Sequence, residues 1–294
     1  MAEGRIMKAL SGFYYVQSDE NLYACKGRGL FRKQKVSPLV GDLVVFDKSS
    51  DLEGYIQEIK PRKTELSRPP IANVDQAMIV NSVKMPQFSP LLLDRFLVFI
   101  ESKRIKPLII INKIDLANDS DLKTIKEFKA IYEKIGYHVL LFSAKEPRDF
   151  MTMKSLFNDK ITVFAGQSGV GKSSILNAVK PSLTLETAQI SKSLGRGRHT
   201  TRHVELLEIN GGLVADTPGF SVVDFSHISR EELGLCFPEI KTFQAHCKFR
   251  GCLHDKEPGC AVKQAVANKE MATFRYDHYL AFLEEIQSRK PRYS

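Results

Sequence analysis

The chain has 294 residues, of which 43% are hydrophobic and 26% are charged, a composition that is ordinary for a globular protein with more than one core. Its formal net charge of +9 favours a polyanionic partner such as RNA. No apolar run approaches the roughly eighteen residues of a membrane-spanning helix, so no membrane partner is expected. Residues 1–5 contain an acid and no apolar segment, which predicts a cytoplasmic protein without a signal peptide.

Residues 1–68 are predicted to form a small OB-like β-barrel. Short runs rich in β-branched and aromatic residues are separated by turn residues at intervals that suit such a barrel; they are Gly4–Val16, Leu22–Cys25, Asp42–Phe46 and Tyr55–Ile59. Residues 26–35 hold five basic residues and one aromatic, which fits either an RNA-binding loop or a solvated turn. Residues 62–70 are predicted to be an irregular linker because they end in two prolines.

Residues 69–224 are predicted to form an α/β domain. A strand at Gln76–Val80 and an amphipathic helix at Pro90–Lys103 precede the continuous apolar strand Leu108–Ile111. That strand runs directly into Asn112-Lys113-Ile114-Asp115, where nucleotide-binding residues belong in a parallel sheet. The Asp115 carboxylate could accept hydrogen bonds from N1–H and the 2-amino group of guanine, which adenine cannot supply, and this disfavours an ATP-dependent kinase.

A second motif also follows directly after a predicted strand. The predicted helix Leu122–Ile135 and the predicted strand His138–Phe142 lead to Ser143-Ala144-Lys145. The tripeptide is common by chance, but its place at the end of a strand is the one that a base-binding loop would need.

A third motif predicts a phosphate-binding loop. The residues Gly166-Gln167-Ser168-Gly169-Val170-Gly171-Lys172-Ser173 match G-x-x-x-x-G-K-[ST] without a gap. A short strand, Ile161–Ala165, precedes them, and a helix beginning at Ser174 follows. The glycines would let backbone N–H groups converge on a phosphate, Lys172 would reach the β- and γ-phosphates, and the Ser173 hydroxyl would bind Mg²⁺. The chain is therefore predicted to bind a nucleoside triphosphate, the alternative being a chance glycine-rich loop.

Residues 181–203 are polar and include a run of glycines, basic residues and hydroxyls at 195–203, which is typical of a mobile switch. Strands at Val204–Ile209 and Gly212–Ala215 then lead to Asp216-Thr217-Pro218-Gly219. Asp216 could hold Mg²⁺ through water, and the Gly219 backbone N–H could contact the γ-phosphate.

Residues 225–294 are predicted to form a mainly α-helical zinc-binding domain, with helices at Ala261–Lys269 and Ala272–Ser288. Three thiols and one imidazole lie within fourteen residues, which suits a tetrahedral structural Zn²⁺ site; the ligands would be Cys247, Cys252, His254 and Cys260. Disulfides are a poor alternative in a cytosolic protein, and four unrelated buried residues are the other. Cys25 and Cys236 are expected to be packing residues.

The motifs N-K-x-D, S-A-K, G-x-x-x-x-G-K-S and D-x-x-G together resemble the guanine-nucleotide signature of the small GTPases. In ordinary GTPases the phosphate loop comes first and the guanine motifs last. Here residues 112–115 and 143–145 precede residues 166–173, so the chain looks like a circularly permuted P-loop GTPase. With a basic barrel in front and a cysteine/histidine cluster behind, its whole length resembles the bacterial ribosome-small-subunit-dependent GTPases of the RsgA family.

The resemblance implies GTP hydrolysis stimulated by the small (30S) ribosomal subunit, binding to its 16S rRNA, and a role in late assembly of that subunit by a monomeric protein. It implies one Zn²⁺ per chain, Mg²⁺, and GTP as substrate. The alternative is a GTP-regulated RNA-binding scaffold in which hydrolysis is incidental. The expected GTP-binding set is Asn112, Lys113, Asp115, Ser143, Ala144, Lys145, Gly166, Gln167, Ser168, Gly169, Val170, Gly171, Lys172, Ser173, Ser174, Asp216 and Gly219.

The resemblance also assigns catalytic roles. Lys172 would neutralise charge on the γ-phosphoryl group, and Thr201 would join Ser173 and Asp216 at Mg²⁺, with Thr200 as the competing candidate. Phe220 stands after Gly219, where many GTPases carry a water-orienting glutamine. Members of the family are thought to use a switch histidine instead, which corresponds to His199 here; a charged RNA contact is the alternative role for His199.

Overall fold

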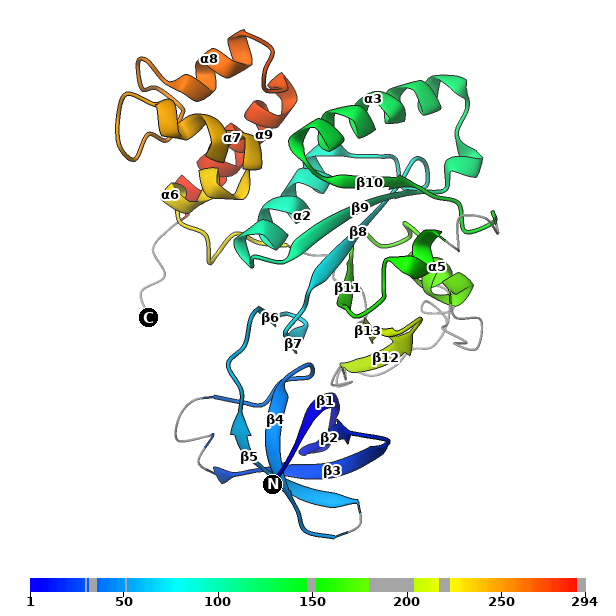
Figure 1. Cartoon of the computed structure of the whole chain (residues 1–294). Helices are drawn as coiled ribbons and strands as arrows, with labels where there is room; N and C mark the ends of the chain where they lie inside the picture. The colour runs from blue at the N-terminus through cyan, green and yellow to red at the C-terminus, as the bar shows by residue number, and fades with distance from the viewer. Residues whose placement is uncertain are drawn as a thin grey trace.

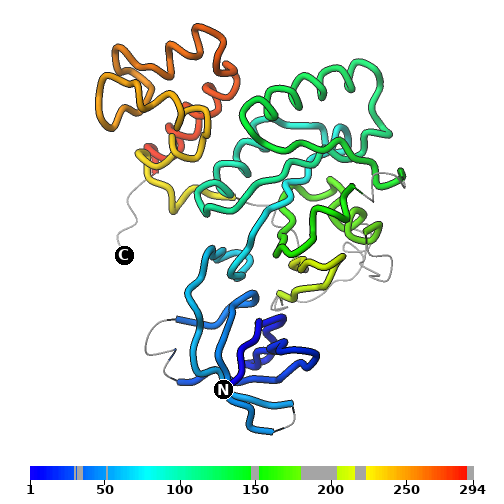
Figure 2. The backbone as a smooth tube through the Cα atoms, viewed as in Figure 1, coloured from blue at the N-terminus to red at the C-terminus, as the bar shows by residue number. Residues whose placement is uncertain are grey.

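The computed structural model describes residues 1–29, 31, 36–50, 52–146, 152–179, 204–216 and 223–289. A strand barrel and a helical C-terminal unit lie on either side of a central mixed sheet (Figure 1). The chain passes from the barrel through the sheet to the helical unit (Figure 2). Among the described residues, no helix is both long and apolar enough to cross a membrane.

Five strands close the N-terminal barrel, which confirms the OB-like prediction. They are β1 (Ala2–Leu10), β2 (Phe13–Ser18), β3 (Asn21–Gly27), β4 (Leu43–Lys48) and β5 (Glu53–Ile59). Their order is β1-β2-β3-β5-β4, and β4 pairs back with β1. The single strand predicted at Gly4–Val16 is two strands, because Ser11 and Gly12 both adopt positive φ and reverse the chain.

The expected irregular linker contains a hairpin of β6 (Glu65–Ser67) and β7 (Pro70–Ala72), so that expectation is wrong. Pro69 lies in the turn and Pro70 is the first residue of its strand, two places where a missing N–H is tolerated. The Arg62 side chain attaches this linker to the barrel through two hydrogen bonds of 2.8 Å to the buried Asp42 carboxylate.

The central sheet has the strand order β10-β9-β8-β11-β13-β12, and only β12 is antiparallel to its neighbour. The strands are β8 (Gln76–Ser82), β9 (Lys106–Asn112), β10 (His138–Leu141), β11 (Ile161–Ala165), β12 (Glu205–Ile209) and β13 (Gly212–Asp216). Strand β11 thus lies between β8, which precedes it in the chain, and β13, which follows it. Lys8 of β1 pairs with Glu205 of β12, which continues the sheet into the barrel.

Helices cover both faces of this sheet. Ala77 and Ile79 of β8 belong to the core shared with α2 (Pro90–Ser102) and α3 (Asp119–Ile135). Met78 and Val80 belong to a second core with α5 (Lys172–Val179). This alternation follows from the two-residue period of a strand that is buried on both faces.

The C-terminal unit is mainly helical, as predicted, and packs on the outer side of α2 and α3 (Figure 1). Its elements are α6 (Arg230–Leu233), η2 (Gly234–Cys236), α7 (Pro238–Phe243), η3 (Gln244–His246), α8 (Ala261–Ala267) and α9 (Thr273–Gln287). Ser229 and Glu232 form the capping box that starts α6. Cys25 and Cys236 are buried apart from the other cysteines, as expected for packing residues.

Candidate nucleotide site and metal centre

The loop between β11 and α5 is held close to the neighbouring strands by its glycines. Gly166, Gly169 and Gly171 have φ values of +134°, +84° and +100°. A Cβ atom at Gly166 would lie 2.2 Å from the Val80 carbonyl oxygen, and one at Gly171 would lie 2.3 Å from Asn112 Nδ2. Both the conformation and the close approach therefore require glycine.

Lys172, the first residue of α5, folds its side chain over this loop. Its ammonium donates hydrogen bonds to the Gly166 carbonyl at 2.7 Å and to the Gln167 carbonyl at 2.8 Å. Burial lowers the pKa of Lys172 to about 8. A half-buried cation whose hydrogen-bond partners among the described residues are carbonyl oxygens is suited to receive an anion at this position. Ser173 and Ser174 follow on the first turn of α5 and are half-buried.

Asn112 and Lys113 attach the end of β9 directly to the glycine loop. Asn112 Nδ2 donates to the Val170 carbonyl at 2.9 Å, and Lys113 Nζ donates to the Gly169 carbonyl at 2.6 Å. Lys113 has a φ of +62°, which turns its side chain back across the loop. Asn112 Oδ1 is buried and has no hydrogen-bond partner among the described residues. Within the part of the chain that the structure describes, this oxygen is thus an unused acceptor at the edge of the loop.

Asp115 and the residues 143–145 meet because β9 and β10 are parallel neighbours. The Asp115 carboxylate accepts a hydrogen bond from Ser143 Oγ at 2.8 Å and pairs with Lys145 Nζ at 2.7 Å. The hydrogen bond from Lys145 lowers the pKa of Asp115 and outweighs burial, which raises it, and the hydrogen bond from Ser143 lowers it further. The carboxylate is therefore ionised at neutral pH and held in one orientation. Ala144 lies between its two partners.

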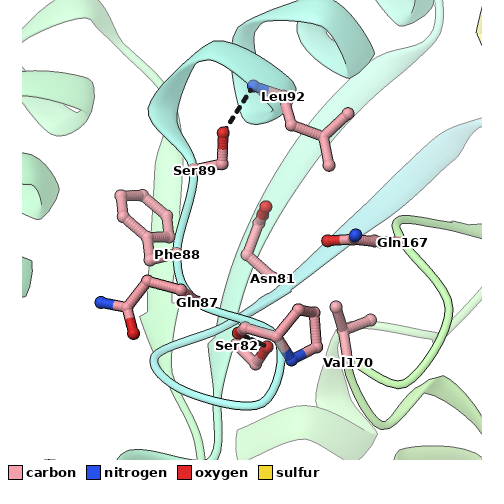
Figure 3. A pocket seen from close by; sticks show the side chains of 9 residues that line it. Asn81, Ser82, Gln87, Phe88, Ser89, Leu92, Gln167 and Val170 are labelled. Carbon is pink, nitrogen blue, oxygen red and sulfur yellow. Dashed lines mark hydrogen bonds between the residues drawn. The ribbon is translucent and has the colours of Figure 1, made fainter.

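The loop between β8 and α2 forms another wall of the candidate nucleotide site, and this wall was not predicted from the sequence. Gln167 and Val170 of the glycine loop face Asn81 and Phe88 across a small pocket (Figure 3). Lys113 Nζ also donates to the Met85 carbonyl of this wall. The polar pair Asn81-Ser82 after the apolar run of β8 is the signal that could have identified it, since it marks the carboxyl end of a parallel strand.

Other predicted residues are described in part or not at all. Asp216 is the last residue of β13, which runs parallel to β11, so it lies at the same edge of the sheet as the glycine loop. His199, Thr200, Thr201 and Gly219 lie outside the described residues.

A separate cluster brings together the four predicted metal ligands, whose Sγ and ring nitrogen atoms all lie within 4.8 Å of one another: Cys247, Cys252, His254 and Cys260. His254 Nδ1 lies 3.6 Å from Cys247 Sγ and 3.4 Å from Cys260 Sγ. Tetrahedral ligands at the usual metal–ligand distances of about 2.0 to 2.3 Å would be separated by about 3.3 to 3.8 Å. Burial and the neighbouring Cys260 raise the pKa of Cys252 to about 12, so gathering thiolates here requires a cation.

The loop that carries His254 is fixed by side chains around the cluster. Tyr276 and Tyr279 of α9 donate to the carbonyls of His254 and Leu253 at 2.6 Å and 2.7 Å. The Glu257 carboxylate accepts from the Leu253 backbone N–H at 2.8 Å. Burial lowers the pKa of His254, so its ring is neutral, as a metal ligand must be. The donor set and its support fit a metal ion.

Comparisons with known proteins agree with this arrangement. A family model described as "RsgA GTPase" matches residues 59–226, and one described as "RsgA N-terminal domain" matches residues 3–56. The chain is 64% identical over 293 residues to "Small ribosomal subunit biogenesis GTPase RsgA 2" of Oceanobacillus iheyensis, with both chains covered completely. It is 56% identical over 298 residues to "Small ribosomal subunit biogenesis GTPase RsgA" of Bacillus subtilis, again over all of both chains.

Two solved structures share the whole fold. The crystal structure of YloQ, "a circularly permuted GTPase", has a TM-score of 0.86 and 52% identity, and the match covers 100% of this chain and 97% of that one. YjeQ from Thermotoga maritima has a TM-score of 0.87 and 36% identity, with 98% and 99% covered. The strand order of the sheet is that of a permuted GTPase, and the sequence is matched along its length. The chain therefore belongs to the RsgA family and is a circularly permuted GTPase.

Proposed function

We propose that this GTPase binds GTP at the carboxyl edge of its central sheet and couples hydrolysis to binding of the small (30S) ribosomal subunit and its 16S rRNA during late assembly. The observation that carries the proposal is the junction of Asp115 with Ser143 and Lys145 beside the glycine loop. This junction supports a guanine-reading role for the Asp115 carboxylate, because it lies at the same sheet edge as the proposed phosphate-binding loop. Relatives that share the full length are named small ribosomal subunit biogenesis GTPases.

For GTP recognition, the Asp115 carboxylate would accept hydrogen bonds from guanine, held in place by Ser143 and Lys145. Asn112 Oδ1, which lacks a partner among the described residues, is available to a donor on the base. The N–H groups of residues 166–174 would surround the phosphates. Lys172 would exchange its loop carbonyls for phosphate oxygens, which would raise its pKa again.

For hydrolysis, Ser173 and Asp216 lie at the edge where Mg²⁺ is needed, and a hydroxyl and a carboxylate are ligands that Mg²⁺ accepts. When bound, this ion would screen the negative charge of the β- and γ-phosphates. From the segment outside the described residues, Thr201 would complete the metal ligands, Gly219 would contact the γ-phosphate, and His199 would orient the attacking water. The roles of Thr201 and His199 come from the family resemblance, and that of Gly219 comes from its place in the D-x-x-G motif.

The cluster at residues 247–260 would hold one structural Zn²⁺, because its three thiols and one neutral imidazole are the ligands that zinc prefers in a closed site. We assign residues 1–68 to RNA contact, 69–224 to GTP hydrolysis and 225–294 to the zinc-dependent unit. The net charge of +9 supports an RNA partner.

The test is to measure kcat for GTP with and without purified small subunits, together with Asp115→Asn. We expect subunits to raise kcat. The variant should lose GTP affinity and gain affinity for xanthosine triphosphate, whose C2 carbonyl can receive the new amide N–H. Asp119→Asn, a change of the same kind in the first turn of α3, is the matched control and should leave base preference unchanged. An unstimulated kcat would instead make the protein a GTP-regulated scaffold.

A further inference from the structure

A second pocket, of about 580 Å³, lies between the GTPase sheet and the C-terminal unit. One side is the end of α2 and the start of β9, and the other side is formed by residues 227–241. Because β9 starts here and ends at Asn112, the pocket is at the sheet edge opposite the proposed GTP site. Its volume falls in the range of about 300–1,000 Å³ that is typical of ligand sites, and such sites are frequent between domains.

Three cations border this pocket: Arg104, Lys106 and Lys241. All three side chains are exposed. They take part in none of the ion pairs found between described residues. Two carboxylates, Glu101 and Glu232, also line the pocket, so its three exposed cations are in excess and favour an anionic group at its entrance.

The inside of the pocket adds hydrogen-bond acceptors. Glu101 is half-buried, and burial raises its pKa, while the Tyr137 hydroxyl and the Lys241 ammonium oppose that rise. Ser102 Oγ lies 2.9 Å from His227 Nε2, and the His227 ring packs edge-on against Phe99 with centroids 5.2 Å apart. A carboxylate and a fixed ring next to apolar walls suit a flat group that carries N–H donors.

We propose that this pocket binds a nucleotide, with its phosphate on Arg104, Lys106 and Lys241 and its base inside against Glu101 and His227. An acidic peptide fits less well, because it would bring carboxylates against Glu101 and would supply no flat donor group. The nucleotide has two sources, an unpaired residue of RNA or a free mononucleotide. The RNA source rests on the proposed function, and the pocket chemistry is the same for both.

The first experiment separates the two sources. Full-length zinc-loaded protein, with its first site saturated by a non-hydrolysable GTP analogue, is titrated by calorimetry with AMP, CMP, GMP and UMP. Ribose 5-phosphate and adenosine control for the phosphate and the base alone. In parallel, a single-stranded RNA hexamer that contains 4-thiouridine is bound and photo-crosslinked. We expect crosslinks within residues 101–107 and 227–241, and binding that needs both phosphate and base.

Variants then test the assigned side chains. Lys106→Ala with Lys241→Ala should weaken binding of the hexamer by roughly tenfold or more, and should lower the slope of log K against log salt by about 0.7, the value for one phosphate contact on a single strand. Leu235→Trp, which fills the pocket from an exposed position, should weaken binding and leave the salt slope unchanged. Lys126→Ala, an exposed lysine on α3, is the matched control and should have no effect.

Binding of a mononucleotide through these residues identifies a free nucleotide as the ligand, and binding of the hexamer alone identifies RNA. The proposal is overturned if neither binds once the first site is saturated, or if the double variant behaves like Lys126→Ala. Failure of the proposed function would be seen separately, as a wild-type kcat that small subunits do not change.

Discussion

The barrel and the C-terminal unit flank the same sheet, but different kinds of contact attach them to it. On the barrel side, β1 and β12 meet at Lys8 and Glu205, whose charged groups lie 2.9 Å apart with side chains 32% and 42% exposed. On the other side, Arg275 and Asp94 are fully buried and 2.5 Å apart. The attraction between Lys8 and Glu205 is weakened by solvent and salt, whereas Arg275 and Asp94 are shielded from water and held in one geometry.

The buried contact is part of a network. Arg275 also binds Glu239 at 2.6 Å, and Asp94 accepts hydrogen bonds from Tyr132 at 2.7 Å and His278 at 2.6 Å. Asp94 lies on α2, so the C-terminal unit is anchored to the helix whose preceding loop lines a small pocket together with the glycine loop. The barrel is anchored to β12, which follows the predicted switch segment in the sequence, and to the linker through Arg62 and Asp42. The comparison suggests a C-terminal unit of fixed orientation and a barrel that is easier to displace.

Removing the metal should produce the largest difference in stability between the C-terminal unit and the barrel. Cys252→Ser, or treatment with a chelator, should unfold residues 225–289 and leave the barrel and sheet folded, because zinc binding supplies on the order of 10 kcal/mol in small zinc units. Hydrogen exchange measures this, and metal analysis of untreated protein should find about one Zn²⁺ per chain. Cys236→Ser, outside the cluster, should keep the metal. Freshly purified protein without zinc would contradict the assignment.

Breaking the buried network around Arg275 should have the second-largest effect on stability. Arg275→Met leaves Asp94 and Glu239 buried without their cation, which should lower the free energy of unfolding by about 3–5 kcal/mol. Denaturant unfolding measures the change. Arg230→Met, which removes an arginine from an exposed ion pair with Glu231, is the control and should cost less than about 1 kcal/mol. If both variants lost the same free energy of unfolding, the buried ion pairs would be no stronger than an exposed one, and the contrast between the two sides of the sheet would fail.

A smaller effect should depend on pH. Arg95, and then Arg289, lower the pKa of Glu285 below its unfolded value of 4.5, so the stabilisation is complete above pH 4.5 and is lost as pH falls through the folded pKa. Glu285→Gln should therefore be less stable than wild type at pH 7, by less than about 1 kcal/mol because the pair is partly exposed. The two unfolding midpoints should converge in acid. Glu284→Gln should show no such convergence, and a difference that persists in acid would exclude the ion pair as its cause.

The smallest effect is expected at the barrel. A double-mutant cycle with Lys8→Met and Glu205→Gln should give a coupling of about 0.2–1 kcal/mol, which falls as salt is added because both side chains are exposed. A coupling comparable to that of Arg275 with Asp94 would show that the barrel is held as firmly as the C-terminal unit.

The nucleotide edge could be predicted from sequence because each motif follows an apolar strand, and parallel strands bring their carboxyl ends together. The buried network could not. The apolar face predicted for the helix at Pro90–Lys103, which includes Leu93 and Phe96, is buried in α2. Asp94 between them would be assigned to solvent by its charge. Its burial depends on Arg275, which lies 181 residues away in the chain.

The hairpin β6–β7 was missed for a related reason. Prolines predict an absence of regular structure from local rules, but the pairing of Leu66 with Ile71 buries both side chains completely. That gain comes from the tertiary environment of the linker and has no local signal.

The order of strands has a consequence during synthesis of the chain. The β8–β10 part emerges from the ribosome after the barrel, and β11 follows about 80 residues after β8, which takes about 4–16 s at bacterial elongation rates. Until then, one edge of the apolar strand β8 has no partner, and the nascent chain lacks the loop that could take up a nucleotide. An unpaired apolar edge invites association with other chains. We therefore expect translation-arrested chains that end between residues 146 and 160 to require a chaperone, and those that extend beyond β13 to be released from it.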